Sequence, residues 1–154
     1  MTVDVVDAGP KKISRSAVIE ASPDELFEIV AHPRLHHELD GSGTVGTTIT
    51  GPDRLSDGAK FTTHMKQRGV PYKITSRVTD FADGRVVEWQ HPVGHRWRWE
   101  FAPSGEHSTL VTETFDYSTV GAVRAGFFRI ARIPKQNTAG IEATLINLQE
   151  RYLA

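Results

Sequence analysis

The 154-residue chain contains no cysteine, so it has no disulfide framework and no thiolate for catalysis or metal binding. No apolar run approaches the roughly 18 residues of a transmembrane helix, so we expect no stable membrane insertion. The first ten residues carry acidic side chains and lack the apolar segment of a secretory signal. The formal net charge of -1 argues against a nucleic-acid partner, because such proteins usually present a basic surface. We therefore expect a cytoplasmic protein.

The composition is that of an ordinary globular protein, with 38% hydrophobic and 24% charged residues. The length suits one domain with a substantial core, and no repeat or low-complexity segment divides the chain. We expect a single domain over residues 1–154, in which residues 1–10 form a flexible arm.

The longest helical pattern lies at the C-terminus, over residues 134–153. Its apolar residues recur at the spacing i, i+4, i+7 and i+11, which places them on one face of an α-helix. These residues are Ile141, Leu145, Leu148 and Tyr152. Three more apolar residues stand on the opposite side, so the sequence predicts a helix buried on two sides. They are Ala139, Ala143 and Ile146.

Two short helices are predicted near the N-terminus. The sequence Ser22-Pro23-Asp24-Glu25 combines a capping serine, a proline at the first helical position and the acidic residue of a capping box. His32-Pro33 ends this helix, because a residue before proline avoids the helical region. A second short helix is predicted over residues 34–39. The later segment 118–132 is also predicted to be helical.

The rest of the chain is predicted to form strands, because alternating segments are separated by turn residues every 8–12 residues. One helix cannot cover a flat sheet of this size, so the sheet must bend around it. We therefore predict an α+β fold, in which a seven-stranded antiparallel sheet wraps around the C-terminal helix and leaves a hollow between them. The seven strands are expected at residues 11–20, 44–50, 59–68, 72–81, 85–91, 95–102 and 108–117.

Several local sequences resemble the START-like, or polyketide cyclase/dehydratase-like, superfamily, which includes the birch pollen allergen fold. The resemblance covers roughly residues 12–153. It implies a helix-grip fold that binds lipids, steroids, polyketides or other apolar molecules in its hollow. A minority of such families are cyclases, aromatases or dehydratases, so the fold leaves the function open. The segments that carry the resemblance are Ala21–Phe27, His32-Pro33, Leu39–Gly43, Trp97–Phe101 and Asn137–Leu148.

One face of the predicted sheet is unusually aromatic. In strand 95–102 the residues His95, Trp97, Trp99 and Phe101 alternate with charged residues, so the aromatic side is expected to point inward. It is either a wall for a flat apolar ligand or ordinary core. Tyr72 and Ser76 are additional polar groups that could orient a ligand. The residues predicted to bind the ligand are Phe61, Thr63, Met65, Trp89, His91, Trp97, Trp99, Glu113, Phe115, Tyr117, Ile141 and Leu145.

Glu113 is the sharpest anomaly, because its strand neighbours Val111 and Phe115 place it on the apolar, inward face. Burial disfavours an unpaired carboxylate and raises its pKa. Such a group can serve as a general base or as a hydrogen-bonding partner for a ligand. The alternative is a structural role, either paired with an arginine or near the edge of the sheet. Glu113 and His91 are the two candidates for a catalytic acid or base.

A histidine-rich patch near residue 36 invites a metal-site interpretation that the spacing does not favour. His36 and His37 are adjacent and point in different directions on a helix, which leaves His32 and His36 as the only workable pair. Because zinc sites need three or four converging ligands, we predict no metal. The segment Asp40–Gly43 could form a hinged lid, and residues 127–132 are amphipathic and basic.

The sequence therefore favours the binding of a small hydrophobic or aromatic molecule, without a cofactor, by a monomer or homodimer. An enzyme of the polyketide cyclase or dehydratase type is the second possibility, with Glu113 or His91 as its acid or base. A protein-interaction module whose hollow is filled by side chains is the third. These alternatives differ in whether a hollow exists and in what Glu113 faces.

Overall fold

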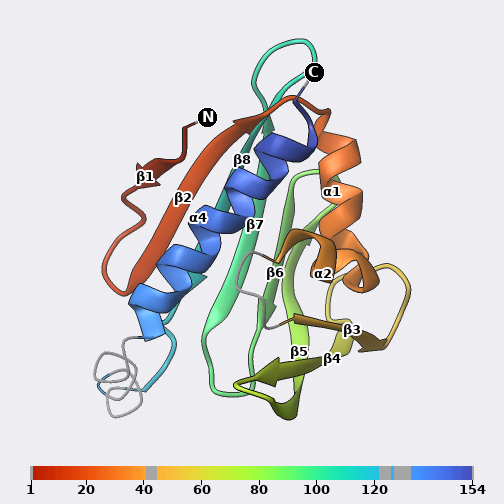
Figure 1. The fold of residues 1–154 in the computed structure, drawn as a ribbon, viewed down its shortest axis with the longest axis vertical. Helices are drawn as coiled ribbons and strands as arrows, with labels where there is room; N and C mark the ends of the chain where they lie inside the picture. The colour runs from red at the N-terminus through yellow and green to blue at the C-terminus, as the bar shows by residue number, and fades with distance from the viewer. Residues whose placement is uncertain (1, 41–44, 122–125, 127–132, 154) are drawn as a thin grey trace.

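The structure, a computed structural model, describes residues 2–40, 45–121, 126 and 133–153 (Figure 1). In these residues eight strands form one sheet in the order β1-β2-β8-β7-β6-β5-β4-β3, and every neighbouring pair is antiparallel. The strands are β1 (Asp4–Val6), β2 (Lys12–Ile19), β3 (Val45–Thr50), β4 (Lys60–Gln67), β5 (Val70–Ala82), β6 (Val86–Gln90), β7 (Arg96–Pro103) and β8 (Thr109–Asp116).

The extra strand corrects the prediction of a loose N-terminal arm and a seven-stranded sheet. β1 pairs with β2 in antiparallel register, with Asp4 opposite Ser16 and Val6 opposite Ser14. Sequence alternation could not reveal it, because this edge strand has three residues and Val5 is 74% exposed. Its stability comes from the ladder that β2 offers, and no apolar face of its own is needed.

The short helices begin and end where the sequence predicts. In α1 (Pro23–Ala31) the Ser22 hydroxyl accepts a hydrogen bond from the Glu25 N–H at 3.3 Å, which satisfies an amide that the helix itself cannot. His32 is extended, with φ -107° and ψ 99°, and ends the helix before Pro33. A 3-10 turn, η1 (Pro33–Leu35), and a short helix, α2 (His36–Leu39), follow.

The C-terminal helix α4 (Ile133–Arg151) lies across β2 and β8 (Figure 1). Ile141, Leu145 and Leu148 are almost fully buried, as the helical spacing predicts. The predicted second buried side is wrong, because Ala139 and Ile146 are exposed and Ala143 is only partly buried. One sheet face can cover only one stripe of a helix, and here that stripe is completed by polar residues. They are Thr144 and Gln149.

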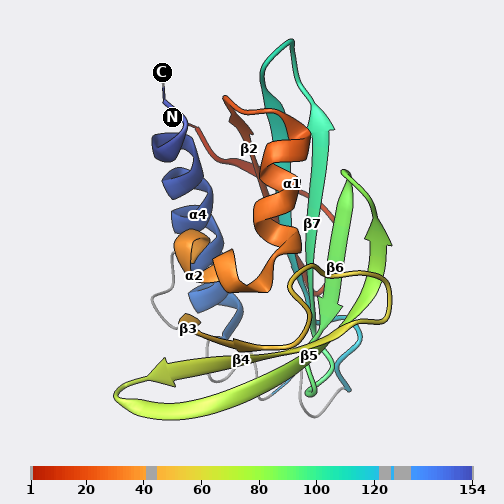
Figure 2. The ribbon, with the colours of Figure 1, turned by 90° about the vertical axis from the view of Figure 1, so that its right-hand side faces the viewer.

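The sheet bends strongly between its two ends. Figure 2 shows β2, β8, β7 and β6 running alongside the helices, whereas the β4–β5 hairpin turns across the lower end of the molecule. A bulge lies between Val78 and Asp80 of β5. The extra residue increases the local bend and returns Phe81 to the face that packs on Phe27. The bent sheet thus has a concave face that carries the helices.

Two further points bear on membranes and on the unassigned segment. Among the described residues, no helix is both long enough and apolar enough to cross a membrane. The predicted helix over residues 118–132 lies largely outside the described part of the chain, as do residues 41–43 of the predicted lid and the amphipathic segment 127–132.

Candidate functional site

Glu113 lies on the concave face of β8, away from both edges of the sheet. It is 7% exposed, and its Oε1 has no hydrogen-bond partner among the described residues. Burial raises the pKa of this carboxyl well above its usual range, and the nearby charge of Asp40 raises it further. The raised pKa favours the neutral acid, a form that can donate one hydrogen bond as well as accept others.

Among the described residues, Glu113 has no ion pair with an arginine, which was one of the alternatives that the sequence left open. Arg15 of β2 stands directly opposite Glu113 in the ladder and is the cation that register would pair with it. Its guanidinium turns away, with Nε 3.3 Å from Glu142 of α4 and Nη1 2.9 Å from the Ser14 carbonyl oxygen. The acid Glu142 thus satisfies Arg15 from the helix, and Glu113 remains without a counter-ion among the described residues.

Asp40 follows α2, and its charge is felt by Glu113 and by Tyr72 of β5. Burial raises the pKa of the Tyr72 hydroxyl, and the negative charge of Asp40 raises it further. The row of Glu113 meets β5 at Phe81, nine residues beyond Tyr72, so the ladder does not bring Tyr72 and Glu113 together. Glu113 and the charge of Asp40 form the polar part of the candidate site.

An aromatic surface adjoins this polar part. In the ladders Trp99 lies opposite Glu113, and Trp97 lies opposite Phe115 on one side and Trp89 on the other. Trp99 and Phe115 are buried, whereas Trp97 and Trp89 are partly exposed. Rings along β8 are also in contact, since the centroid of Phe115 is 5.0 Å from Trp97 and 5.6 Å from Tyr117.

The remaining predicted ligand residues are on the same side of the sheet. Phe61 and Thr63 of β4 are buried, and Met65 is partly buried. Ile141 and Leu145 of α4, the helix that packs on β2 and β8, are almost fully buried. Along β4, β6, β7 and β8 the predicted inner residues are more buried than most of their neighbours, in agreement with the alternation of the sequence.

His36 is a site residue that the sequence analysis treated only as part of a polar patch. Its ring stacks on Trp89 with centroids 5.1 Å apart and meets Phe61 edge-on at 5.8 Å. Its Nε2 lies 2.7 Å from the Val30 carbonyl oxygen. Burial lowers the pKa of His36 to about 4, so the ring is neutral and acts as part of the aromatic surface.

The other histidines of this patch are used separately. His32 places Nδ1 2.6 Å from the Glu28 carbonyl oxygen, and His37 is exposed. Within the described residues, no three His, Cys, Asp or Glu side chains converge as ligands for a metal. The four-residue helix α2 separates its two histidines in direction, as adjacent positions on a helix require.

His91 is brought near His95 and not near Glu113. The two rings stack with centroids 4.2 Å apart, and Nδ1 of His91 accepts a hydrogen bond from the Val93 N–H at 3.0 Å. Burial lowers the pKa of both, that of His95 to about 3. Glu113 lies opposite Trp99, which lies opposite Val87. His91 is four residues farther along the chain than Val87, so it is distant from Glu113 along the strand direction. One acid/base pair formed from Glu113 and His91 is therefore ruled out.

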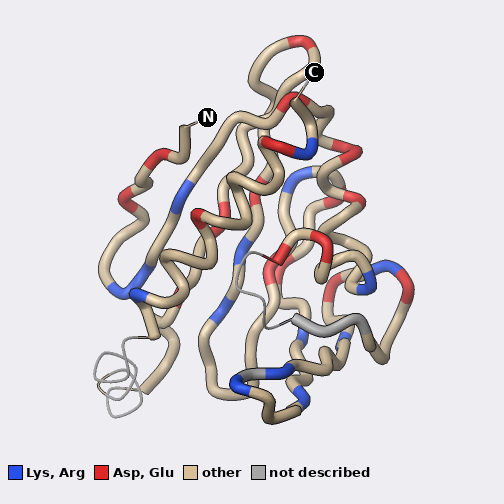
Figure 3. Tube along the Cα trace, in the orientation of Figure 1, with Lys and Arg blue, Asp and Glu red and all other residues tan. Residues whose placement is uncertain are grey.

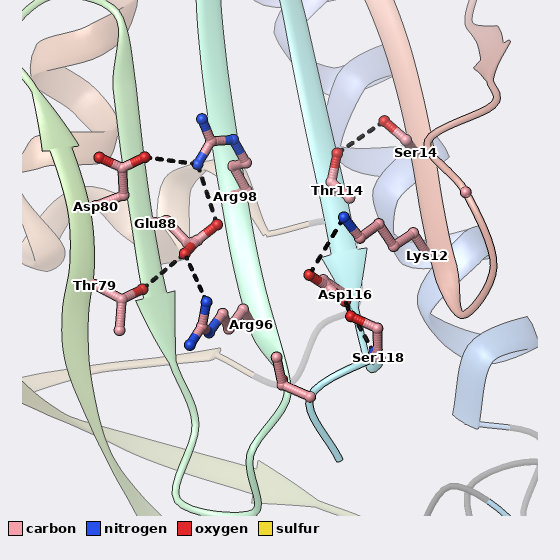
Figure 4. Close-up of polar contacts among 12 residues, drawn as sticks. Lys12, Ser14, Thr79, Asp80, Glu88, Arg96, Arg98, Thr114, Asp116 and Ser118 are labelled. Carbon is pink, nitrogen blue, oxygen red and sulfur yellow. Dashed lines mark hydrogen bonds and ion pairs between the residues drawn. The ribbon is translucent and has the colours of Figure 1, made fainter.

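A second polar cluster lies on the convex face, where the sequence analysis placed no function (Figure 4). Arg98 of β7 contacts Asp80 at 2.9 Å and Glu88 at 3.2 Å, and Glu88 also accepts a hydrogen bond from Thr79 at 2.9 Å. Arg96 is 3.7 Å from Glu88. These opposite charges neutralise one another across neighbouring strands, which is a structural role for the charged side of β7.

Two surface depressions accompany these features. One, of about 470 Å³, is lined by the charged cluster of the convex face, including Glu88 and Arg98. The other, of about 520 Å³, lies beside the start of β4 and the middle of β5 and includes Lys60, Arg77 and His91. Of the predicted ligand-binding residues only His91 borders either depression. The aromatic surface and Glu113 line neither of these two depressions.

Comparison with known proteins places the chain among polyketide cyclase-like proteins. The model of the family described as polyketide cyclase / dehydrase and lipid transport matches residues 10–152. The uncharacterized protein Rv0088 of Mycobacterium tuberculosis is 54% identical over 154 residues, which are 99% of this chain and 69% of that protein.

Solved structures show the same fold at low sequence identity. A protein from Rhodobacter sphaeroides superposes with a TM-score of 0.73 at 14% identity, over 97% of each chain. The Aha1 dimer from Colwellia psychrerythraea superposes with a TM-score of 0.60 at 16% identity, over 92% of this chain and 95% of that one. The architecture is thus shared by proteins whose sequences have diverged widely.

Proposed function

Because the chain belongs to the polyketide cyclase/dehydrase and lipid transport family, we propose that it binds one small apolar or aromatic molecule between the concave face of its sheet and α4. The observation that carries the proposal is Glu113, a buried carboxyl whose Oε1 lacks a hydrogen-bond partner in the described structure. A protein rarely leaves such a group unsatisfied in its interior, because each one costs stability. A ligand that supplies the missing partner accounts for it.

The surrounding residues suit a mainly apolar ligand with one polar group. Trp97 and Trp89 are partly exposed and neighbour each other in the ladder, so they offer ring faces to a flat molecule. Neutral Glu113 would hydrogen bond to a carbonyl or hydroxyl group of that molecule. This division into a broad apolar wall and few polar groups is typical of ligand sites.

A cyclase or dehydratase activity is the second candidate, and the raised pKa of Glu113 favours it. A carboxylic acid that stays protonated at neutral pH can donate a proton to a substrate carbonyl or hydroxyl, and the carboxylate can take one back. Glu113 suits this role better than His91, whose Nδ1 is occupied by the Val93 N–H. A protein-interaction module without a ligand is the third alternative.

Native mass spectrometry of the purified chain tests the binding proposal and also reads out the monomer or homodimer. We expect a co-purified small molecule, or tight binding of an apolar fluorescent probe such as anilinonaphthalene sulfonate. Trp97→Ala should weaken binding about tenfold or more, because the partly exposed ring would leave the wall. The matched control, Glu106→Gln, changes an exposed carboxylate and should bind as the wild type does.

The two leading functions separate on Glu113→Gln. For a catalyst, the variant should lose turnover of the co-purified molecule while it keeps most of its affinity, since glutamine hydrogen bonds but cannot transfer a proton. For a binding protein, the wild type should leave that molecule chemically unchanged. Absence of any bound molecule, together with equal probe fluorescence for the wild type and Trp97→Ala, would overturn both and favour the interaction module.

A further inference from the structure

From the start of β4 to Thr79, the β4–β5 hairpin carries cations and no carboxylates. Residues 58–79 contain five lysines and arginines and no aspartate or glutamate, although the whole chain has a net charge of -1. Figure 3 shows these basic residues along the hairpin at the end of the molecule. They are Lys60, Lys66, Arg68, Lys73 and Arg77.

Most of these cations share the convex face of the hairpin. In the ladder Lys60 lies opposite Arg77, and His64 lies opposite Lys73. Like charges in directly opposed positions destabilise a sheet, so packing alone does not explain the arrangement. No carboxylate pairs with the five cations in the described structure, whereas Arg54 and Arg98 each contact two or more acids. This face therefore carries an unneutralised positive potential.

The tip of the hairpin combines charge with exposed apolar surface. Its two-residue turn, Arg68-Gly69, has φ values of 51° and 79°, which match a type I′ turn. Asn, Asp or Gly is preferred at the first of these positions, so an arginine is held there at a conformational cost. Val70 is 64% exposed and Tyr72 37% exposed beside it. Strained, charged and apolar residues thus meet at one projecting end.

We propose that this hairpin docks on the surface of an anionic lipid bilayer. Lys66, Arg68 and Lys73 would lie among the anionic headgroups, while Val70 and Tyr72 enter the interface between headgroups and acyl chains. A nucleic acid or an acidic protein would also meet the charge, but neither accounts for an aliphatic tip. A bilayer accounts for both, since interfacial anchors pair basic residues with apolar ones.

Two features extend the surface beyond the tip. The depression of about 520 Å³ beside the start of β4 and the middle of β5 is lined by Lys60, Arg77 and neutral residues, so no carboxylate interrupts the positive potential there. Tyr72 belongs to the concave side of β5, whose next inward residues are Ile74 and Ser76. Docking by the tip would therefore bring the concave side of the sheet next to the membrane. The docking itself requires no bound ligand.

Co-sedimentation of the full chain with lipid vesicles tests the proposal. We expect binding to vesicles of phosphatidylcholine with phosphatidylserine, weak binding to phosphatidylcholine alone, and release by salt, which screens surface charges. The triple variant Lys66→Ser, Arg68→Ser and Lys73→Ser should bind the anionic vesicles on the order of a hundredfold less, because each basic residue at such a surface contributes roughly fivefold.

A charge-matched control isolates the hairpin. The triple variant Lys11→Ser, Arg85→Ser and Lys135→Ser removes three exposed cations from other elements, and it should bind anionic vesicles nearly as the wild type does. Circular dichroism should show both triples folded. Equal loss in the two triples, or no vesicle binding by the wild type, would overturn the proposal. So would binding to an oligonucleotide or to polyglutamate in preference to the vesicles.

The variant Val70→Ser tests whether the apolar side chain at the tip contributes to vesicle binding. Val70→Ser keeps every charge, and it should weaken binding to the anionic vesicles several-fold, because the apolar contact with the interface is lost. Unchanged binding of this variant would contradict insertion of the tip. A failed vesicle assay would leave the ligand-binding proposal intact, since mass spectrometry reads that function without any membrane.

Discussion

At the scale of single residues, Glu113 couples stability to pH. Its folded-state pKa lies above its unfolded value, so between the two the folded chain holds a proton that the unfolded chain has released. Raising the pH through that window lowers the free energy of unfolding. When the pH is above both the unfolded-state and the folded-state pKa, each unit of difference between them lowers the free energy of unfolding by about 1.4 kcal/mol.

Glu113→Gln should therefore stabilise the unliganded protein at alkaline pH and change it little near pH 4. Glutamine has nearly the same shape and cannot ionise, so the penalty of a buried charge disappears. Denaturant unfolding at a series of pH values measures the effect. Glu106→Gln is the control, because it makes the same substitution at an exposed position. A profile equally steep in Glu113→Gln would show that another group is responsible.

His36 makes the free energy of unfolding depend on pH in the acidic range, where lowering the pH destabilises the folded chain. Its folded-state pKa is about 4 against 6.5 for an ordinary histidine, so the unfolded chain binds a proton before the folded one does. Stability should fall as the pH is lowered from about 6.5 to about 4, by up to about 3 kcal/mol from this residue. His36→Phe, which keeps a ring against Trp89, should make the acid limb shallower in urea unfolding.

His37→Phe is the control for His36→Phe. His37 is exposed and adjacent, and His37→Phe should retain the full acid limb. His95, whose pKa is lowered to about 3, supplies a remaining slope in both variants. If His36→Phe and His37→Phe show the same acid limb as the wild type, His36 is not the group that titrates.

The two residues also differ in how far sequence could predict them. Glu113 stands between Val111 and Phe115 in a strand, where alternation fixes the face, so its inward position is predicted and then confirmed. His36 belongs to a four-residue helix, which is too short for a periodic pattern. Its stacking on Trp89 depends on where η1 and α2 meet β6, and only the folded chain sets that.

At the scale of elements, α4 depends on one apolar stripe. Leu145 is fully buried against the sheet, so Leu145→Ala should lower the free energy of unfolding by about 2–5 kcal/mol through lost contacts and a new cavity. Ile146, the next residue, is 38% exposed, and Ile146→Ala should cost less than about 1 kcal/mol. Thermal unfolding of the pair measures the difference. Equal losses would contradict the one-sided packing of α4.

The elements themselves were largely predictable, and their exceptions share a cause. Caps and prolines mark the limits of α1, and turn residues separate the strands of the meander. The N-terminal strand β1, the bulge in β5 and the exposed side of α4 were not predicted. Each depends on a partner distant in the chain, such as β2 for β1 and β6 for the bulge.

At the scale of the whole molecule, curvature decides what the faces do. The sheet bends around the helices (Figure 2). Its concave side gathers aromatic rings and Glu113, while its convex side carries the charges of β7 and of the β4–β5 hairpin. On β7 the charges pair with neighbouring acids. The lysines and arginines of the hairpin have no acid on the neighbouring strand, because β4 contains no Asp or Glu and β5 contains none before Asp80. The same alternation thus yields a structural network in one place and an open basic surface in another.

The sequence by itself determined the α+β class, the meander of strands from β2 onward, the inward faces of β4, β6, β7 and β8 and the long terminal helix, because all of these follow from periodicity and turn chemistry over a few neighbouring residues. Only the tertiary structure decided that Arg15 turns to Glu142, so that Glu113 has no counter-ion in the described part of the chain. It also decided that His36 joins the aromatic surface and that His91 stands apart from Glu113. Those outcomes depend on side chains that meet across the fold, where spacing along the chain carries no information.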